Sequence, residues 1–153
     1  STSITWDLSW STALLGTNYT TNYYSYPSIT QDSSGRIWVI ARYSDGTKYW
    51  IKARRSLNPN SVSSWESTTY ELSDSSNTSG VVFPGIIPLS NNKVYAFWYR
   101  HNAIEGKLFD GTNWNSNVTN IATTWTDSYL GIPSGLADSN DKIYLAYSSV
   151  SLL

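Results

Sequence analysis

Aromatic side chains that could stack on a sugar recur along this chain, and a few arginines and other polar residues accompany them. The chain holds 12 Tyr and 8 Trp among its 153 residues. Aromatic rings have an apolar face and a low ordering cost, so they suit shallow binding surfaces, where Asp, Asn and Arg bind hydroxyl groups. The alternative is that these rings only pack loops and sheet interfaces. The candidate ligand-binding residues are Tyr24, Tyr26, Arg42, Tyr43, Arg100, His101, Trp125 and Tyr129.

Residues for catalysis or metal binding are scarce. His101 is the single histidine and there is no cysteine, which excludes a histidine-based or thiolate metal site. A Ser-His-Asp triad would rest on His101 alone. Glu105 and Asp127 could serve as the paired carboxylates of a glycosidase, but nothing in the sequence brings them together. We therefore assign no catalytic residue, no metal ligand and no cofactor.

The charge balance narrows the classes of partner. Charged residues make up 14% of the chain and the formal net charge is −1, without a basic cluster, so a nucleic-acid partner is not expected. No apolar run approaches the roughly 18 residues of a membrane-spanning helix, so no membrane insertion is expected. Richness in Tyr, Asn and Thr, together with three glycosylation triplets, indicates an extracellular or surface-associated protein.

An internal repeat in the sequence indicates the strands that would position the candidate ligand-binding residues. The segments "PSITQDSSGRIWVIARY", "PGIIPLSNNKVYAFWYR" and "PSGLADSNDKIYLAYSS" align without gaps from Pro27, Pro84 and Pro133, which lie 57 and 49 residues apart. Trp6, Trp65 and Trp114 precede these prolines by 21, 19 and 19 residues. A period near 50 with about four short strands is typical of a β-propeller blade. The repeats span approximately 6–64, 65–113 and 114–153.

One repeat can be divided into strands and turns. We predict strands at 27–30, 36–43, 48–56 and 65–72, with turns at 32–35 and 44–47 where Asp, Ser and Gly gather. In "IWVIA", Trp38 and Ile40 point to one side and Ile37, Val39 and Ala41 to the other. A strand that is apolar on both sides is covered on both sides, as expected where one blade packs between two others.

The strand-turn-Trp pattern resembles the sialidase-type propellers, whose blades carry an Asp-box signature, S-x-D-x-G-x-x-W. "RRSLNPNSVSSW" (54–65) lacks the Asp and Gly of the box, and "KLFDGTNW" (107–114) lacks its leading Ser. The second segment also resembles the Asp-Gly-x-x-Trp turn of fucose-binding propeller lectins. The resemblance implies an all-β propeller of four-stranded antiparallel blades, in which the Asp and Trp of the box are structural.

The resemblance also implies where a ligand would bind. In sialidase-type propellers the functional face carries two kinds of loop. Loops that join one blade to the next correspond here to 16–26, 73–83 and 123–131. Loops that join the second and third strands of a blade correspond to 43–47 and 99–105. Sialidases hold a carboxylate with an arginine cluster, and Arg42 and Arg100 end their second strands on this face. Arg42 and Arg100 differ by one position in the alignment of the repeats. The alternative interpretation is that both are solvated residues at strand ends. The family's Tyr–Glu nucleophile pair and complete arginine triad are absent.

Three repeats do not close a propeller ring. Residues 1–15 have the pattern of an outer strand, and the last repeat reaches only a second strand, so we expect two copies to share blades in a six-bladed ring. The rival interpretation is a fragment of a longer propeller. We predict an extracellular module, a homodimer, that binds a glycan or another cell-surface partner. The alternatives are a sialidase-like glycoside hydrolase and a structural surface or viral component without a small-molecule ligand.

Overall fold

The computed structural model of the chain describes residues 23–73, 81–100, 103–123, 128–130, 133–147 and 149–151. Within these ranges the secondary structure consists of antiparallel strands, and no helix occurs. Two sheets have four strands and two have two strands. The predicted all-β class is therefore confirmed.

The first sheet contains β1 (Tyr23–Gln31), β2 (Ile37–Ser44), β3 (Tyr49–Arg55) and β4 (Tyr70–Glu71), paired in that order. The second repeats this order with β5 (Val81–Pro88), β6 (Val94–Arg100), β7 (Ala103–Phe109) and β8 (Thr119–Thr123). The third sheet pairs β10 (Ser134–Ala137) with β11 (Ile143–Ala146). A separate pair joins β9 (Ser128–Leu130) to β12 (Ser149–Ser151).

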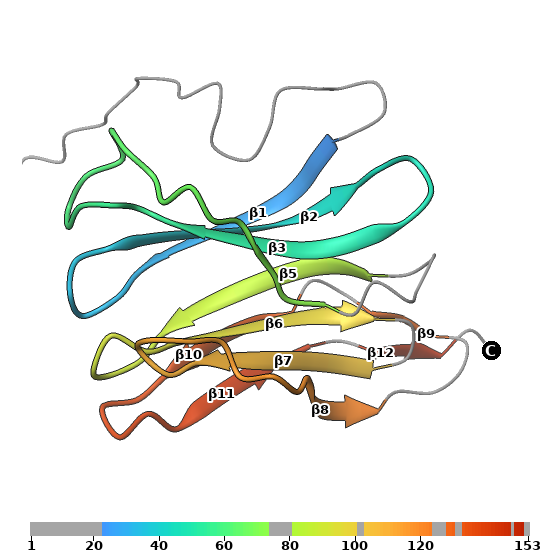
Figure 1. Cartoon of the computed structure of the whole chain (residues 1–153). Coiled ribbons are helices and arrows are strands. Elements are labelled where there is room, and N and C mark those ends of the chain that lie inside the picture. The colour runs from blue at the N-terminus through green and yellow to red at the C-terminus, as the bar shows by residue number, and fades with distance from the viewer. Residues whose placement is uncertain are drawn as a thin grey trace, which may run out of the picture.

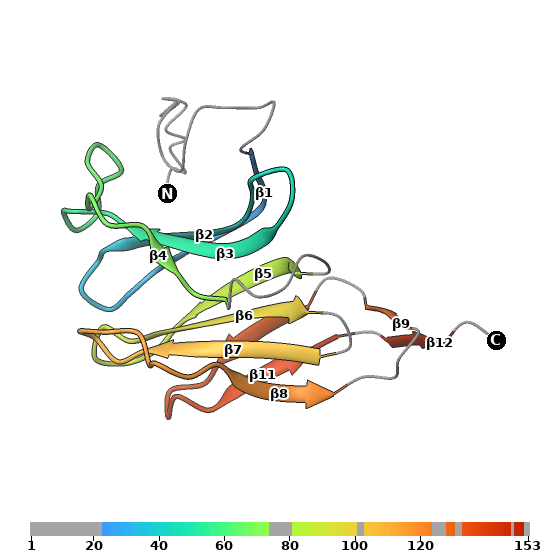
Figure 2. The same ribbon diagram turned by 45° about the vertical axis from the view of Figure 1, so that its right-hand side comes forward.

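The sheets are stacked as layers, with the second sheet between the first and the third (Figures 1 and 2). The inner strand β5 contacts β1, β2 and β3 on one side and β10 on the other. The described residues therefore form consecutive stacked sheets, and a closed ring is not seen among them.

Each sheet has two faces, which we name by what they contact. The forward face points to the next sheet along the chain and, in β2, carries Trp38, Ile40 and Arg42. The rear face points the other way. Trp38 and Ile40 lie in one buried cluster with Val94, Ala96 and Trp98, the rear face of β6. The prediction that β2 is apolar on both faces and buried is confirmed, because Trp38, Val39, Ile40 and Ala41 are all buried.

The same packing rule joins the second sheet to the third. The forward face of β6 carries Tyr95 and Phe97, and the rear face of β11 carries Ile143 and Leu145. At Gly135 of β10, a Cβ atom would lie 2.5 Å from the Leu145 side chain and 2.7 Å from that of Ile87 on β5. This close approach leaves room only for glycine, and it shows that the forward face of the second sheet meets the rear face of the third.

The first turns of consecutive repeats are joined by hydrogen bonds at equivalent positions. The Ser33 hydroxyl accepts from Asn92 N at 2.7 Å and donates to Asn92 Oδ1 at 3.0 Å. One repeat later, Ser90 donates to Asp141 through its N at 2.6 Å and its hydroxyl at 2.7 Å. The bonds from Lys93 and Ser90 lower the pKa of Asp141 to about 2. The same two positions of the repeat therefore join the first turns of the first and second sheets and those of the second and third.

Aspartates of the turns act as caps, as the repeat predicted. Asp45 Oδ1 accepts from Thr47 N and Lys48 N at 2.8 and 2.7 Å, and Asp110 Oδ1 accepts from two backbone N–H groups of its own turn at 2.8 Å each. These backbone bonds lower the pKa of both carboxyl groups. Gly46 and Gly111 supply the positive φ, 91° and 103°, that each turn requires.

The strand bounds differ from those that the sequence predicted, in both directions. The strand expected at 65–72 is reduced to β4 (Tyr70–Glu71) and an isolated bridge at Trp65, whereas β1, β5 and β9 take in residues expected in loops. Residues 23–26 and 81–83 were expected in loops of the functional face, but they belong to β1 and β5, and 128–130 form β9. A bulge in β1 places Tyr26 at φ 54°, and the matching bulge in β5 places Phe83 at φ 53°. The bulges let the strands continue past Pro27 and Pro84, because the prolines, which lack an N–H, are left out of the ladder.

Within the described ranges, no helix is long and apolar enough to span a bilayer.

Candidate functional site

Three tyrosine rings surround the guanidinium group of Arg42 at the end of β2, and we call this arrangement the tyrosine cage. The Arg42 Cζ atom lies 4.7 Å from the ring centroids of Tyr26 and Tyr49 and 5.9 Å from that of Tyr23. These distances are typical of cation–π contacts. Arg42 Nε donates to Ser25 Oγ at 2.8 Å, and no carboxylate among the described residues forms an ion pair with Arg42.

Register explains the cage. Antiparallel pairing sets Ser25 opposite Arg42, and Tyr23 and Tyr49 on either side of Ser44, so all these side chains share the forward face. Hydrogen bonds to Ser44 and Tyr49, with the positive charge of Arg42, lower the pKa of Tyr23, and the bond with Tyr23 raises the pKa of Tyr49. Tyr26 is 44% exposed and packs against Phe83 at 4.8 Å, so one side of the cage is open to solvent.

Arg100 of the second sheet lies in the same layer between sheets as Arg42. It follows Trp98 by two residues on the rear face of β6, just as Arg42 follows Ile40 on the forward face of β2. Because Arg42 and Arg100 are offset by one residue in the repeat, they lie on opposite faces of equivalent strands. The forward face of the first sheet packs on the rear face of the second sheet, so both arginines lie in the layer between these two sheets. Since β2 and β6 run in the same direction in Figure 1, both arginines lie at the same end of it.

Arg100 is already paired. Its NH1 lies 3.4 Å from each carboxylate oxygen of Glu105, which also accepts from Trp98 Nε1 at 3.0 Å. Cross-strand pairing sets Trp98 directly opposite Glu105. This network leaves Glu105 engaged with a cation and an indole, which is a structural use of the carboxylate.

The rear face of the first sheet carries a second aromatic arrangement, which we call the aromatic ladder. Tyr24, Tyr43 and Trp50 lie opposite one another on β1, β2 and β3, with ring centroids 5.0 and 5.6 Å apart. Lys52 Nζ lies 3.8 Å from the centroid of Tyr43. Burial, followed by the proximity of Tyr43, raises the pKa of Tyr24. Trp50 Nε1 is buried and has no hydrogen-bond partner in the described part of the chain.

The structure divides the candidate residues from the sequence into groups. Tyr26 and Arg42 meet in the cage, Tyr24 and Tyr43 meet in the ladder, and Arg100 shares the layer of the cage but pairs with Glu105. Tyr129 lies in β9, for which only the backbone is described, and His101 and Trp125 lie outside the described residues. Asp127 also lies outside, so its pairing with Glu105 stays a prediction.

Sequence reasoning missed three residues of these arrangements, namely Tyr49, Trp50 and Lys52, and it placed Tyr23 in the loop 16–26 without selecting it as a ligand-binding residue. A signal for them existed in the turn "SDGT". Closing this hairpin between Ser44 and Tyr49 sets Tyr43 opposite Trp50, and alternation then assigns each side chain to a face.

The remaining charged residues of the first sheet serve the fold. Glu66 Oε1 accepts from Arg36 at 3.0 Å and from Arg55 at 2.9 and 2.6 Å, while Glu66 Oε2 accepts from the Tyr70 hydroxyl at 2.9 Å. Among the residues that the structure describes, no group of three or more His, Asp or Glu side chains could hold a metal ion.

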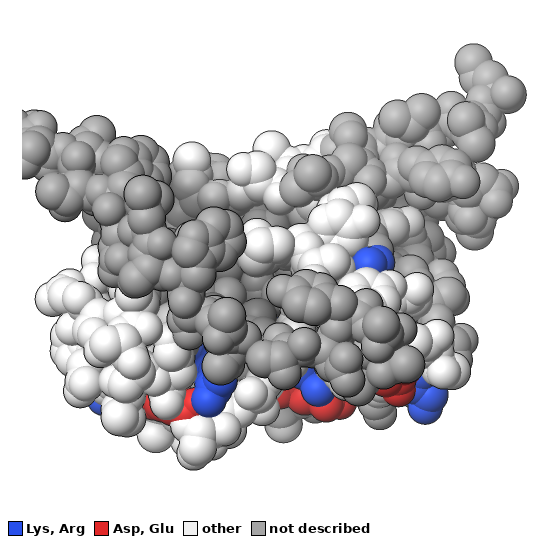
Figure 3. Space-filling view, turned by 90° about the horizontal axis from the view of Figure 1, so that it is seen from above, with Lys and Arg blue, Asp and Glu red and all other residues white. Residues whose placement is uncertain are grey.

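The upper face of the molecule is mostly uncharged where it is described. Viewed from above, the acidic side chains lie along one border, and the rest of the described surface is largely white with a few basic groups (Figure 3).

Comparison with known proteins leaves the family open. No family model matches the chain, and no curated protein matches it significantly.

Proposed function

We propose that this chain is a carbohydrate-binding module of a surface or extracellular protein, and that the tyrosine cage is its sugar site. Arg42 carries the proposal: its guanidinium is held among tyrosine rings and has no carboxylate partner among the described residues. Tyr26, which is 44% exposed, brings part of an aromatic side chain to the solvent next to this guanidinium. This combination of an aromatic face and a planar donor suits a sugar that bears hydroxyl or carboxylate groups.

Removing the guanidinium should weaken sugar binding. In Arg42→Ala we expect about a 10- to 100-fold loss of affinity for the best ligand of a glycan array, because a charge-assisted hydrogen bond is worth roughly 1.5–3 kcal/mol. Arg42→Lys should recover part of the affinity, since it keeps the charge but loses the planar fork. Titration calorimetry measures the affinities, and circular dichroism shows that each variant is folded.

A control on the opposite face of the same sheet separates the two aromatic arrangements. Lys52→Ala removes the cation of the aromatic ladder and should leave affinity within about twofold, as expected of a distant site. Loss of binding in Lys52→Ala with full binding in Arg42→Ala would move the site to the ladder. Failure of the folded chain to bind any glycan would instead favour the structural component, and turnover of a fluorogenic sialoside would favour the hydrolase.

We also propose that the three sheets are blades of a sialidase-like propeller, completed to six blades by a second copy. The way the sheets pack supports this proposal. The forward face of one sheet packs on the rear face of the next, between the first and second sheets and again between the second and third. The forward face of the third sheet has no partner among the described residues. Leu136 and Tyr144 on that face are 61% and 46% exposed, and Ile29 on the rear face of the first sheet is 65% exposed. Placing these two faces together repeats the observed contact.

The ring predicts a dimer. Sedimentation velocity at micromolar concentration should show twice the chain mass, and Leu136→Glu should convert the dimer to a monomer, because the substitution places a charge in the new interface. Since Leu136 is exposed within one copy, the variant should remain folded. A monomeric parent chain would contradict closure by a second copy and favour the longer-propeller interpretation.

A further inference from the structure

Tyr26 of β1 and Phe83 of β5 share an unusual backbone conformation. Their φ angles are 54° and 53°, in the left-handed region that bulky side chains rarely adopt. Each precedes a proline at the same position of the repeat, and neither has a partner in the strand ladder because both lie in bulges. Strained positions of this kind persist only where neighbouring contacts hold them, and they cluster at binding sites.

The bulge in β1 serves the tyrosine cage. Successive side chains of a regular strand point to opposite faces, yet both Ser25 and Tyr26 contact the guanidinium group of Arg42. Arg42 Nε donates to Ser25 Oγ at 2.8 Å, and the Tyr26 ring centroid lies 4.7 Å from Arg42 Cζ. A bulge re-aims a side chain in this way, so the unusual φ of Tyr26 places its ring in the cage.

The bulge in β5 has a different neighbour. Tyr99 holds the position of Arg42 one repeat later, so the second sheet has no arginine at this position. Phe83 instead packs against Tyr26 across the layer between the first and second sheets, with ring centroids 4.8 Å apart and an angle of 62° between the ring planes. Tyr26 is 44% exposed, so burial alone does not confine its ring, whereas an edge-to-face contact favours one orientation.

We propose that Phe83 is a positioning residue of the sugar site: its ring holds the Tyr26 ring over the Arg42 guanidinium. The second sheet thereby takes part in a site whose other residues belong to the first. Phe83 acts through Tyr26 and does not contact the sugar itself. This inference rests on the proposed function, because the site that Phe83 supports is the tyrosine cage.

Removing the Phe83 ring tests the proposal without disturbing the bulge. Phe83→Asn suits the position because asparagine adopts the left-handed conformation more readily than most residues. We expect the affinity for the best ligand of a glycan array to fall about 3- to 10-fold, the range that the loss of one aromatic pair predicts. Phe83→Tyr keeps the ring and should retain the parent affinity. Titration calorimetry measures the affinities, and circular dichroism shows that both variants are folded.

Substitution of both residues shows whether Phe83 acts through Tyr26. In a Tyr26→Ala background, the further change Phe83→Asn should weaken binding by less than about 1.5-fold, because the ring that Phe83 positions is already gone. Losses that add in the double variant would overturn the proposal, since Phe83 would then contribute independently of Tyr26. An unchanged affinity in Phe83→Asn, alongside the loss expected in Arg42→Ala, would also overturn it.

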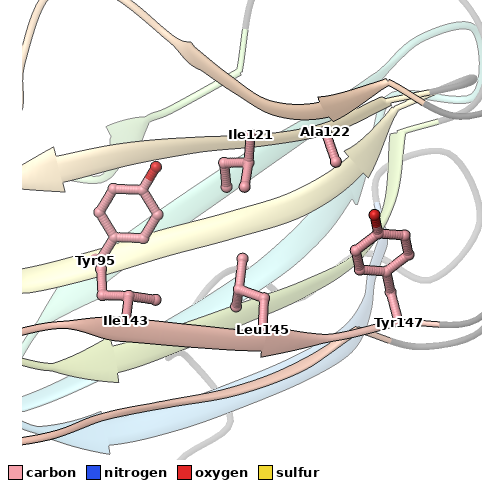
Figure 4. A pocket seen from close by; sticks show the side chains of 6 residues that line it. All are labelled: Tyr95, Ile121, Ala122, Ile143, Leu145 and Tyr147. Carbon is pink, nitrogen blue, oxygen red and sulfur yellow. The ribbon is translucent and has the colours of Figure 1, made fainter.

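A tyrosine from another layer provides the control. Tyr147 lies at one end of an apolar pocket of about 420 Å³, which residues of β6, β8 and β11 line between the second and third sheets (Figure 4). Tyr147 is 45% exposed, close to the value for Tyr26, so Tyr147→Ala removes a comparable side chain outside the layer of the cage. The affinity of this variant should stay within about twofold of the parent chain. Equal losses in Tyr147→Ala and Phe83→Asn would indicate a general effect on the fold and overturn the positioning role.

A measurement without sugar separates this inference from the proposed function. Protons over the face of an aromatic ring resonate upfield, so the Arg42 side-chain signals in NMR spectra report on the position of the Tyr26 ring. In Phe83→Asn these signals should move toward their ordinary position, and in Phe83→Tyr they should stay. If the parent chain binds no glycan, the proposed function fails, but this shift still shows whether Phe83 positions Tyr26. Unchanged Arg42 signals in folded Phe83→Asn would overturn the inference.

Discussion

Replacing Trp38 with alanine should lower the free energy of unfolding by about 3–5 kcal/mol, the usual cost of truncating a buried large aromatic residue. Trp38 is fully buried between the first and second sheets. Its ring packs against Phe109 at 4.8 Å, Trp114 at 5.6 Å and Tyr70 at 5.9 Å, and the Arg55 guanidinium lies 5.1 Å from it. The substitution opens a cavity where these elements meet. Urea unfolding followed by circular dichroism measures the loss.

Two further variants test the cause of this loss. Trp38→Phe keeps an aromatic ring but removes the indole N–H that donates to Asp32 Oδ2 at 2.9 Å, and it should cost less than Trp38→Ala. Trp65→Ala removes a partly exposed tryptophan whose indole donates to the nearby Val62 carbonyl at 3.0 Å, and it should cost under about 1.5 kcal/mol. Equal losses in Trp38→Ala and Trp65→Ala would contradict the assignment of Trp38 to the centre of the core.

Replacing Asp32 with alanine should cost about 2–4 kcal/mol, because unsatisfied buried donors cost roughly 1–3 kcal/mol each and some of these can reach water. Asp32 is 4% exposed. Its Oδ1 accepts from Ser34 N at 3.0 Å, Ser34 Oγ at 2.6 Å and Arg36 N at 3.1 Å, and its Oδ2 accepts from Trp38 Nε1. The variant leaves the Trp38 indole N–H unpaired in the core, and the loss is again measured by urea unfolding.

The chain supplies a matched control in its third repeat. Asp138 caps the equivalent turn, accepting from Asn140 N at 2.9 Å and Lys142 N at 3.0 Å, but it is only partly buried and its turn is more exposed. Asp138→Ala should therefore cost under about 1 kcal/mol. If Asp32→Ala and Asp138→Ala were equally costly, the buried bond from Asp32 to Trp38 would not be the reason for the loss. Asp32→Asn, which keeps one acceptor oxygen, should fall between Asp32→Ala and the parent chain.

Much of the strand order was readable from the repeat. The ungapped match of Pro27, Pro84 and Pro133 predicted three units and the inner hairpin of each, and the Asp-Gly turns predicted where the next strands begin. These features are local: a turn residue supplies a cap or a positive φ, and alternation assigns side chains to faces. The strand ends were less predictable, because the bulges at Tyr26 and Phe83 depend on how the chain passes a proline within a sheet.

The sequence by itself determined the all-β class, the repeat and the role of Asp32 in its turn, because pairing between neighbouring strands is set by short-range patterns. Only the tertiary structure decided which side chains meet across sheets. It brought Arg42 of the first sheet into the layer of Arg100 of the second, and it packed Tyr26 against Phe83. The reason is that successive side chains of a strand point to opposite faces, so that positions one residue apart in the repeat lie on different faces. Which of these faces meet depends on how the forward face of one sheet packs on the rear face of the next.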